Sequence, residues 1–169
     1  MKRLSILVLA LVFAVGCGSP TTPSINPNIA KFTATLLPAN EVPPVTNADA
    51  GARGTLTLTL NLTKDAAGTI TAATGDFTFD LTGFPAGTTL TGAHIHKAAA
   101  GTNAGVLVSV GLGVGEIVLV NGAQVVSKNG INIAAADAQD IINNAANYYF
   151  NVHTQLNGGG AIRAQLTKS

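Results

Sequence analysis

The sequence predicts an all-β domain, an antiparallel β-sandwich or flattened Greek-key barrel with about eight strands and one short helix near residues 134–146. Two observations carry this prediction. Short runs of alternating apolar and polar residues recur at regular spacing, separated by turns rich in glycine and asparagine. A single segment has a helical pattern, which makes the rival architecture, an open two-layer α+β sheet, the less favoured of the two.

The first half of the chain contains the clearest strand, over residues 54–63. Leucine and threonine alternate there almost without error, which is typical of a strand with one buried face and one face in water. A shorter run over residues 32–37 ends at Pro38, and residues 76–81 repeat the period-two pattern. The side chains expected to point into the core from these two clearest strands are Leu56, Leu58, Leu60, Leu62, Phe77, Phe79 and Leu81.

The second half is expected to add shorter strands. Asn121-Gly122 predicts a tight turn because both residues tolerate positive φ, and Asn129-Gly130 is expected to divide residues 124–133 into a strand pair. The helix is expected over residues 134–146, with Asp137 and Asp140 near its start, where the helix dipole favours acids. The remaining strands are expected over residues 90–97, 106–110, 117–120, 148–154 and 161–167.

The first 16 residues have the pattern of a signal peptide, with Lys2 and Arg3 before an apolar run over residues 4–15. That run is too short for an ordinary spanning helix. The run ends in Ala14-Val15-Gly16-Cys17, which resembles a bacterial lipobox. The resemblance implies cleavage before Cys17 and lipidation of its sulfur by a diacylglycerol with palmitate-type chains. Cys17 is also the single cysteine, so an internal disulfide is excluded.

Residues 17–30 are then a lipidated cysteine followed by a flexible tether, because proline, serine and threonine predominate and cannot bury a core. The expected partner of this segment is a membrane, and Gly18 after the cysteine favours the outer membrane in a Gram-negative cell. The folded domain is expected over residues 31–169, with a cell-envelope, extracytoplasmic location.

Charge excludes one class of partner. Loss of Lys2 and Arg3 with the signal peptide leaves seven basic residues against eight acidic ones, so the mature chain is nearly neutral. No basic run or basic-aromatic interleaving appears, and nucleic acid is therefore not an expected partner. Few lysines and many Thr, Asn, Ala and Gly residues favour an envelope protein over a cytosolic enzyme.

All three histidines lie in strand-like segments, as His94, His96 and His153. Residues i and i+2 of a strand share a face, and Ile95 between the first two is expected in the core. Parity also places His153 opposite Phe150 and Val152. The three imidazoles are thus expected on one side of the sandwich, where they form a hypothetical site for one copper or zinc ion.

A purely structural interpretation of the same histidines is equally concrete and is the more favoured one. The imidazoles can hydrogen-bond loop carbonyls, with His153 and Thr154 expected to tie down the loop over residues 98–105. Glu41, which precedes Pro43-Pro44, is a candidate to orient an imidazole, to accept from Arg163, or to cap backbone donors, the last being favoured. Arg163 is expected to form a structural ion pair with Glu41, Asp76 or Asp80, or to clamp an anion.

No catalytic residue is predicted. No serine lies in a nucleophile elbow, and Gly111, Gly113 and Gly115 lack the strand-turn-helix context of a dinucleotide loop. These glycines are expected to form a connection between strands.

Several motifs in order resemble the CHRD domain, named from chordin and widespread in bacterial lipoproteins. The resemblance spans residues 31–167 and departs from the family pattern at Ala161, often Glu, and Ala164, often Gly. It implies an all-β extracytoplasmic domain with no settled biochemical activity. The matching motifs are Phe32-Thr-Ala-Thr-Leu, Asn40-Glu41-Val42-Pro43-Pro44 with Gly51, Gly92-Ala93-His94-Ile95-His96 with Gly101 and Gly105, Tyr149-Phe150-Asn151-Val152-His153-Thr154, and Gly159-Gly160-Ala161-Ile162-Arg163-Ala164-Gln165-Leu166.

A fainter similarity links His94, His96 and Arg163 to copper/zinc superoxide dismutases, which also carry a His-x-His pair on the outer face of a Greek-key barrel. The chain has no further histidines for a second metal and no cysteine pair, so the two-metal dismutase reaction is not expected.

The predicted function is a membrane-anchored, extracytoplasmic binding or structural module that is not an enzyme and recognises an envelope or extracellular partner. The alternative is a copper- or zinc-binding protein that uses His94, His96 and His153. A superoxide-type oxidoreductase is a distant third hypothesis.

Overall fold

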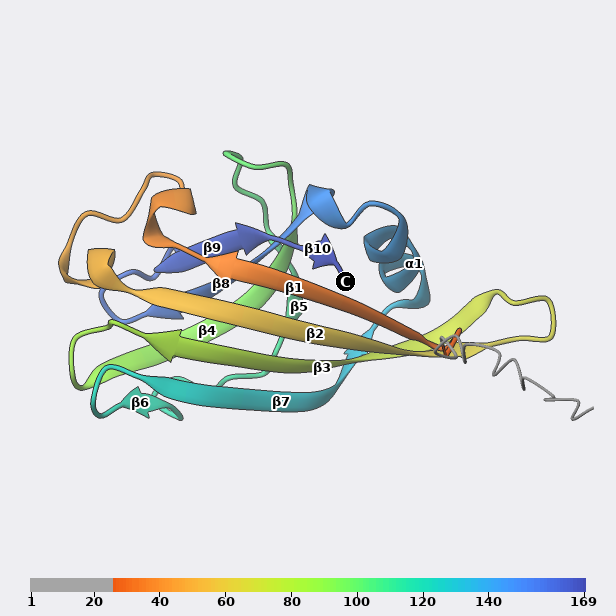
Figure 1. The fold of residues 1–169 in the computed structure, drawn as a ribbon, viewed down its shortest axis with the longest axis horizontal. Helices are drawn as coiled ribbons and strands as arrows, with labels where there is room; N and C mark the ends of the chain where they lie inside the picture. Colours follow the sequence, from red (N-terminus) through yellow and green to blue (C-terminus); the bar gives the residue numbers. More distant parts are fainter. Residues whose placement is uncertain (1–25) are drawn as a thin grey trace, which may run out of the picture.

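The alternating leucines lie in β2 (Arg53–Lys64), the central strand of the first of two sheets in the computed structural model, which describes residues 26–169 (Figure 1). We call this first sheet the leucine sheet. All its neighbouring strands are antiparallel, and β2 pairs along its whole length with β3. In spatial order it contains β10 (Thr167–Lys168), β1 (Ile29–Leu36), β2, β3 (Ile70–Thr82) and β7 (Gln124–Ile133).

The second sheet, which we call the histidine sheet, carries all three histidines. It is also antiparallel, and a two-residue strand, β6 (Val118–Leu119), pairs with the first residues of β4. In spatial order it contains β5 (Val106–Ser109), β4 (Thr88–Lys97), β8 (Tyr148–Thr154) and β9 (Ile162–Gln165).

The core lies between the two sheets and confirms the predicted parity. Leu56, Leu58 and Leu60 are fully buried from the leucine sheet, as are Phe77 and Phe79. From the histidine sheet, Phe150 packs against both phenylalanine rings, with ring centroids 6.1 Å from Phe77 and 5.5 Å from Phe79. The sheets do not close into a barrel within residues 26–169, so the sandwich is the correct one of the two predicted forms.

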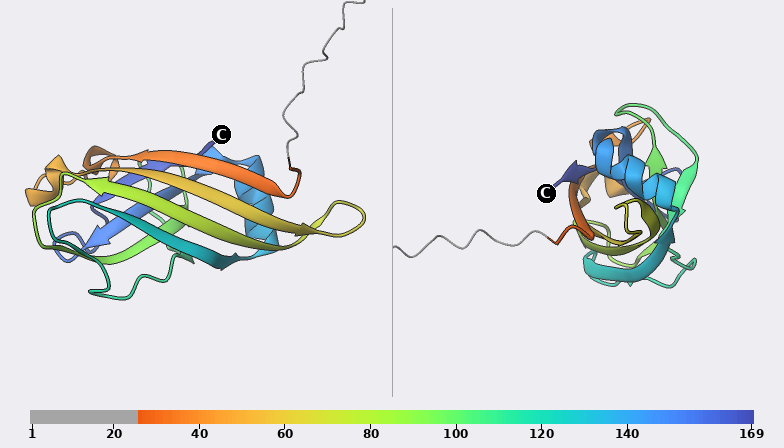
Figure 2. Two further views of the ribbon diagram at one scale, coloured as in Figure 1. Left: turned by 60° about the horizontal axis from the view of Figure 1, so that its bottom comes forward. Right: turned by 90° about the vertical axis from the view of Figure 1, so that its right-hand side faces the viewer.

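The two ends of the sandwich differ. The described chain begins at the end that also holds the β2–β3 hairpin and the helix α1 (Ala135–Asn143), followed by η3 (Ala145–Asn147) (Figure 2). The other end carries the loop with η1 (Pro38–Asn40) and η2 (Ala48–Gly51). An isolated bridge between Leu37 and Arg163 connects the end of β1 to β9 in the second sheet.

Some expected boundaries differ in the structure. Residues 124–133 form one strand, not a strand pair, because Gly130 adopts φ +68° within the strand and donates its N–H to Asp76 Oδ1 (2.9 Å). This bulge absorbs the irregularity without ending the strand. The helix ends at Asn143, three residues before the predicted end. Strand β1 starts at Ile29, two residues before the predicted start of the domain.

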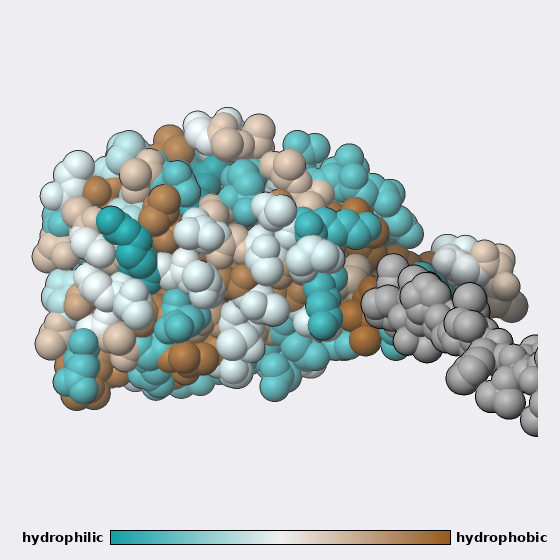
Figure 3. Space-filling view, viewed as in Figure 1, coloured by the Kyte–Doolittle hydropathy of each residue, from teal (hydrophilic) through white to brown (hydrophobic). Residues whose placement is uncertain are grey.

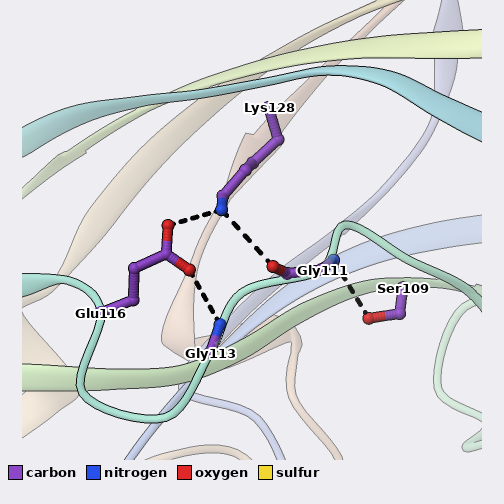
Figure 4. A network of polar contacts seen from close by, with 5 residues as sticks. All are labelled: Ser109, Gly111, Gly113, Glu116 and Lys128. Carbon is purple, nitrogen blue, oxygen red and sulfur yellow. Dashed lines mark hydrogen bonds and ion pairs between the residues drawn. The ribbon is translucent and has the colours of Figure 1, made fainter.

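The glycine-rich segment between β5 and β6 is a connection, as expected, and side chains fix it to the neighbouring strand (Figure 4). Lys128 of β7 forms an ion pair with Glu116 and donates to the carbonyl of Gly111. The Glu116 carboxylate also accepts from the N–H of Gly113 (2.9 Å). These contacts join the segment to the edge of the leucine sheet.

The predicted signal peptide, the lipidated Cys17 and most of the tether lie outside the described residues. In the described part of the chain, no helix has both the length and the apolar character needed to cross a membrane.

Candidate functional site

The three histidines converge on the outer face of the histidine sheet. Strands β4 and β8 are adjacent, and their register places His94 opposite Asn151 and His96 opposite Tyr149. His94 Nδ1 lies 3.0 Å from His153 Nε2. One ligating nitrogen from each of the three rings falls within 4.8 Å of the others. The predicted gathering of the imidazoles is therefore present.

Loop carbonyls determine which ring nitrogens carry hydrogen. His96 Nδ1 lies 3.0 Å from the carbonyl oxygens of Ala104 and of Gly105. His153 Nδ1 lies 3.0 Å from the carbonyl oxygen of Gly158. A carbonyl only accepts, so both Nδ1 atoms donate, and in a neutral ring each Nε2 then carries a lone pair.

Both lone pairs point at the same atom. The Oδ1 atom of Asn151 lies 3.1 Å from His96 Nε2 and 3.0 Å from His153 Nε2. Asn151 is only 2 % exposed, so water does not separate these groups from one another. Two nitrogen acceptors thus converge on a third acceptor, and the donor within reach of them is His94 Nδ1, which lies 3.0 Å from His153 Nε2.

The pKa values of two of the imidazoles, His94 and His153, are lowered. Burial, followed by the neighbouring charges of His153 and His96, lowers the pKa of His94 to about 4. Burial likewise lowers the pKa of His153, although its hydrogen bond to the Gly158 carbonyl opposes the shift. Space for the His94 ring depends on Gly92, where a Cβ would lie 2.7 Å from His94 Cε1. Neutral imidazole is the form that coordinates metal ions.

Tyr149 and Arg163 support the cluster from one side. The Tyr149 ring stacks on His96 with an interplanar angle of 8° and centroids 4.6 Å apart. Its hydroxyl accepts from the N–H of Ala104 (3.3 Å). The Arg163 guanidinium carbon lies 3.4 Å from the centroid of the same tyrosine ring. Tyrosine is thus enclosed between a cation and an imidazole.

The prediction that Arg163 forms an ion pair is wrong. In residues 26–169, Arg163 makes no ion pair with an acid, and its donors go to the loop over residues 98–105. It donates to Thr102 O (2.6 Å) and to Asn103 Oδ1 (2.9 Å). The guanidinium fork satisfies several acceptors at once, so the loop supplies the partners that a carboxylate was expected to supply.

The loop contacts also correct the structural interpretation of His153 and Thr154. His96 and Arg163 hold the loop over residues 98–105, whereas His153 bonds Gly158 in the next loop. The Thr154 hydroxyl donates to Asp49 Oδ2 (2.7 Å), which also accepts from Asn157 Nδ2 (2.6 Å). His96 of β4 and His153 of β8 therefore hold two different loops.

Glu41 is buried beside the cluster, with 5 % of its surface exposed. Its Oε1 atom has no hydrogen-bond partner in the described structure, so the expected capping of backbone donors is wrong for this atom. The carboxyl group lies over Gly160, where a Cβ would be 2.4 Å from Oε1. Burial raises the pKa of Glu41 to about 7, opposed by the charge of Arg163 and by a hydrogen bond from Asn151.

Sequence reasoning did not select Tyr149 or Asn151 as site residues. Parity was the available signal, because Tyr149, Asn151 and His153 alternate along β8 and share its outer face. Asp49 was missed for a different reason, since a loop acid has no periodicity to mark its burial.

The arrangement can hold one small cation through nitrogen ligands. His94 and His153 are only partly buried, whereas His96 is buried. No acidic side chain joins the three rings in the described cluster, which suits copper or zinc better than calcium or magnesium.

A comparison with family models finds the CHRD domain over residues 32–166. No curated protein and no protein of known structure matches the chain.

Proposed function

Because this chain belongs to the CHRD domain family, we propose that it is a non-catalytic binding module held at an extracytoplasmic membrane surface by a lipid on Cys17. The observation that carries the proposal is the enclosed outer face of the histidine sheet. In β8 six of the seven residues are buried, although the strand has one face toward the core and one away from it. Loops therefore cover the second face, and they form the surface that a partner meets.

Side chains of the histidine sheet hold these loops in fixed positions. Arg163 and His96 bond the loop over residues 98–105, and His153 bonds the loop that contains Gly158. Asn40 Nδ2 donates to the carbonyl of Arg163 (3.0 Å), which fixes the loop over residues 38–47. Loops positioned by a rigid scaffold are a common basis for binding. An envelope or extracellular component is the partner class that we propose.

The anchor is supported by the sequence pattern around Cys17. A direct test compares membrane fractions of cells that express the natural chain or Cys17→Ser, and measures the mass of the N-terminal peptide. The proposal predicts a diacylglycerol-modified peptide that starts at Cys17, and loss of the protein from membranes in the variant. An unmodified Cys17 in a membrane-free protein would contradict the anchor.

A second candidate function is the binding of one copper or zinc ion by His94, His96 and His153. The specific observation in its favour is the pair of Nδ1–H groups on loop carbonyls, which leaves two Nε2 lone pairs directed at a shared point. Metal-ligating histidines generally show this arrangement, with the outer N–H fixed by a carbonyl or a carboxylate.

The ion-free cluster can satisfy its acceptors without a cation, because His94 Nδ1 lies within donating distance of His153 Nε2 and a second donor is available from Asn151. The Asn151 amide can turn so that its NH₂ group donates to both Nε2 atoms, which brings its oxygen to the Glu41 side. Glu41 then serves as the donor, in agreement with a pKa raised to about 7. A cation between the rings removes the need for this rotation, and an ionised Glu41 then offsets its charge.

Calorimetric titration of the metal-stripped protein with Cu(II) and with Zn(II) tests this second function. We expect one ion per chain and a loss of affinity of about a hundredfold in His94→Ala. The control variant Ser109→Ala, which removes no imidazole, should bind the ion with unchanged affinity. Absence of stoichiometric binding would contradict both the ion-binding function and the superoxide-type oxidoreductase function. Tight binding without superoxide turnover would remove only the latter.

A further inference from the structure

The hydrophobic core is open at the end of the sandwich where the described chain begins. A hollow of about 640 Å³ lies between β1, the base of the β2–β3 hairpin and α1. Its floor is apolar and is formed by Ala30, Leu62, Ile70 and Ile142. The first three of these belong to the buried core, so the hollow is a continuation of the core toward solvent. Figure 3 shows apolar surface at this end of the molecule, next to polar side chains.

Lysines surround this hollow. Lys31, Lys64 and Lys168 all line it, although the chain has few lysines. Lys64 is committed to the entering chain, because its ammonium donates to the carbonyl of Pro27 (2.6 Å). Within residues 26–169, Lys31 and Lys168 form no ion pair. The nearby Asp65 is occupied by its own turn, where it accepts from Ala67 and Thr69.

The position of the hollow relative to a membrane follows from the tether. Eight residues separate Cys17 from Asn26, the first residue that the structure describes. A fully extended chain spans at most about 3.3–3.6 Å per residue, so this tether reaches roughly 30 Å. A lipid on Cys17 therefore keeps this end of the sandwich near the bilayer surface.

We propose that this end of the sandwich is a binding site for an anionic phospholipid of the membrane that carries the anchor. Lys31 and Lys168 bind the phosphate, and the apolar floor receives the upper part of an acyl chain. The inference rests on the proposed lipid anchor, which supplies the proximity. An amphiphilic anion matches both parts of the site, because its charged group can contact the lysines while its apolar chain contacts the floor.

The experiment uses the lipidated protein reconstituted in vesicles. A thiol-reactive fluorophore is attached to Ala66→Cys in the β2–β3 turn or to Ala86→Cys at the opposite end, and a headgroup-bound quencher is placed in the bilayer. Vesicles contain phosphatidylcholine alone or with about one third phosphatidylglycerol. We expect quenching of the residue-66 probe in anionic vesicles only, and little quenching of the residue-86 probe in either.

Two lysine variants make the test specific. Lys31→Gln/Lys168→Gln should lower the ratio of docked to undocked domain about thirtyfold, and Lys31→Arg/Lys168→Arg should retain docking. Lys64 stays unchanged because it holds the entering chain. Equal quenching in neutral and anionic vesicles, or docking that survives the glutamine pair, would overturn the proposal. Equal quenching in the two kinds of vesicle would also be expected if the chain's own tether fills the hollow.

Failure of the anchor is distinguishable from failure of the site. If Cys17 carries no lipid, its thiol takes up a second fluorophore, and the protein does not float with neutral vesicles. Binding of that unlipidated protein to anionic vesicles, with loss in the glutamine pair, would still support the phospholipid site. No binding to either vesicle would contradict the site as well.

Discussion

The outer faces of the two sheets of this sandwich differ in their burial. In β2 of the leucine sheet, outward side chains such as Thr55 and Thr57 are exposed, and burial alternates strictly with the inward leucines. In β8 of the histidine sheet, inward Phe150 and outward Asn151 are both buried. The difference shows where loops have been placed, and loops over a sheet enclose polar groups that must then find partners.

Enclosure is what makes the outer face of the histidine sheet a candidate site. Threonines of β2 such as Thr55 and Thr57 face solvent and need no partner within the fold. Arg163, Asn151 and Glu41 are removed from water, so each requires a specific partner or a shift in protonation. Most of these requirements are met by the loops, and among the described residues Glu41 Oε1 is the buried side-chain atom that has no partner.

The largest expected effect on stability concerns the alternation of buried and exposed side chains, which differs between the two sheets. Leu58→Ala should lower the free energy of unfolding by about 2–5 kcal/mol, whereas Thr57→Ala should change it by less than about 0.5 kcal/mol. In β8, Val152→Ala and Asn151→Ala should each cost about 1–3 kcal/mol, because both positions are enclosed. Denaturant unfolding of the four variants checks this. A neutral Asn151→Ala would break the contrast between the sheets.

Arginine offers a second comparison of the same kind. Arg163→Met keeps an apolar stem but removes the donors of the loop over residues 98–105, and should cost about 2–4 kcal/mol. Arg53→Met, on the exposed face of the leucine sheet, should cost less than about 0.5 kcal/mol. Equal losses in urea unfolding would show that the loop does not depend on the buried guanidinium.

The pH dependence of stability sharpens the comparison further. Glu41 has a pKa raised to about 7 in the fold, so the unfolded chain releases its proton first and stability falls as the pH rises from about 4.5 to 7. Glu41→Gln removes this loss. Its stability relative to the natural protein should therefore increase over that range by about 1–3 kcal/mol, at most about 1.4 kcal/mol per pH unit.

The histidines change the pH dependence of stability in the opposite direction. They are present in both the natural protein and Glu41→Gln, so their contribution is common to the two unfolding curves. The lowered pKa values of His94 and His153 mean that the unfolded chain binds protons first, so stability falls as the pH drops from about 6.5 toward 4. Unfolding curves of the natural protein and Glu41→Gln that run parallel with pH would contradict a buried neutral Glu41.

A substitution at Gly92 is expected to affect ion binding more than stability. In Gly92→Ala the new methyl group displaces the flexible His94 ring, which should cost about 1 kcal/mol or less. If the cluster binds an ion, the same displacement should weaken binding at least about tenfold. Gly159→Ala is the matched control, since its Cβ would meet no atom within 4 Å. Calorimetry that gives equal ion affinities for the two variants would remove His94 as a ligand.

The leucine sheet was the more predictable half of the fold. Its period-two pattern reports a single buried face, and Leu56 to Leu62 and Phe77 to Leu81 lie where parity expects them. The strand β7 was not predicted as one element, because a bulge at Gly130 imitates a turn in sequence. A pattern of residue types does not distinguish a glycine that ends a strand from one that bends it.

The site was predicted in part, and the missing part has a physical cause. Parity brought His94, His96 and His153 to one face, but it cannot say which loop will cover that face. The partners of Arg163 and the isolation of Glu41 depend on that covering, as does the stacking of Tyr149. Residues whose roles come from loops of distant sequence were therefore assigned wrongly or not at all.

The claim most open to direct measurement is the second candidate function, in which the enclosed face of the histidine sheet binds one ion through the lone pairs of its imidazoles. The ¹⁵N spectrum of histidine-labelled, metal-stripped protein tests it most directly, because the chain holds only three imidazoles. On addition of one equivalent of Zn(II), the account predicts large shifts of Nε2 in His96 and His153, while their Nδ1–H groups stay protonated on the loop carbonyls. Imidazole resonances that remain unchanged with excess Zn(II) would contradict it.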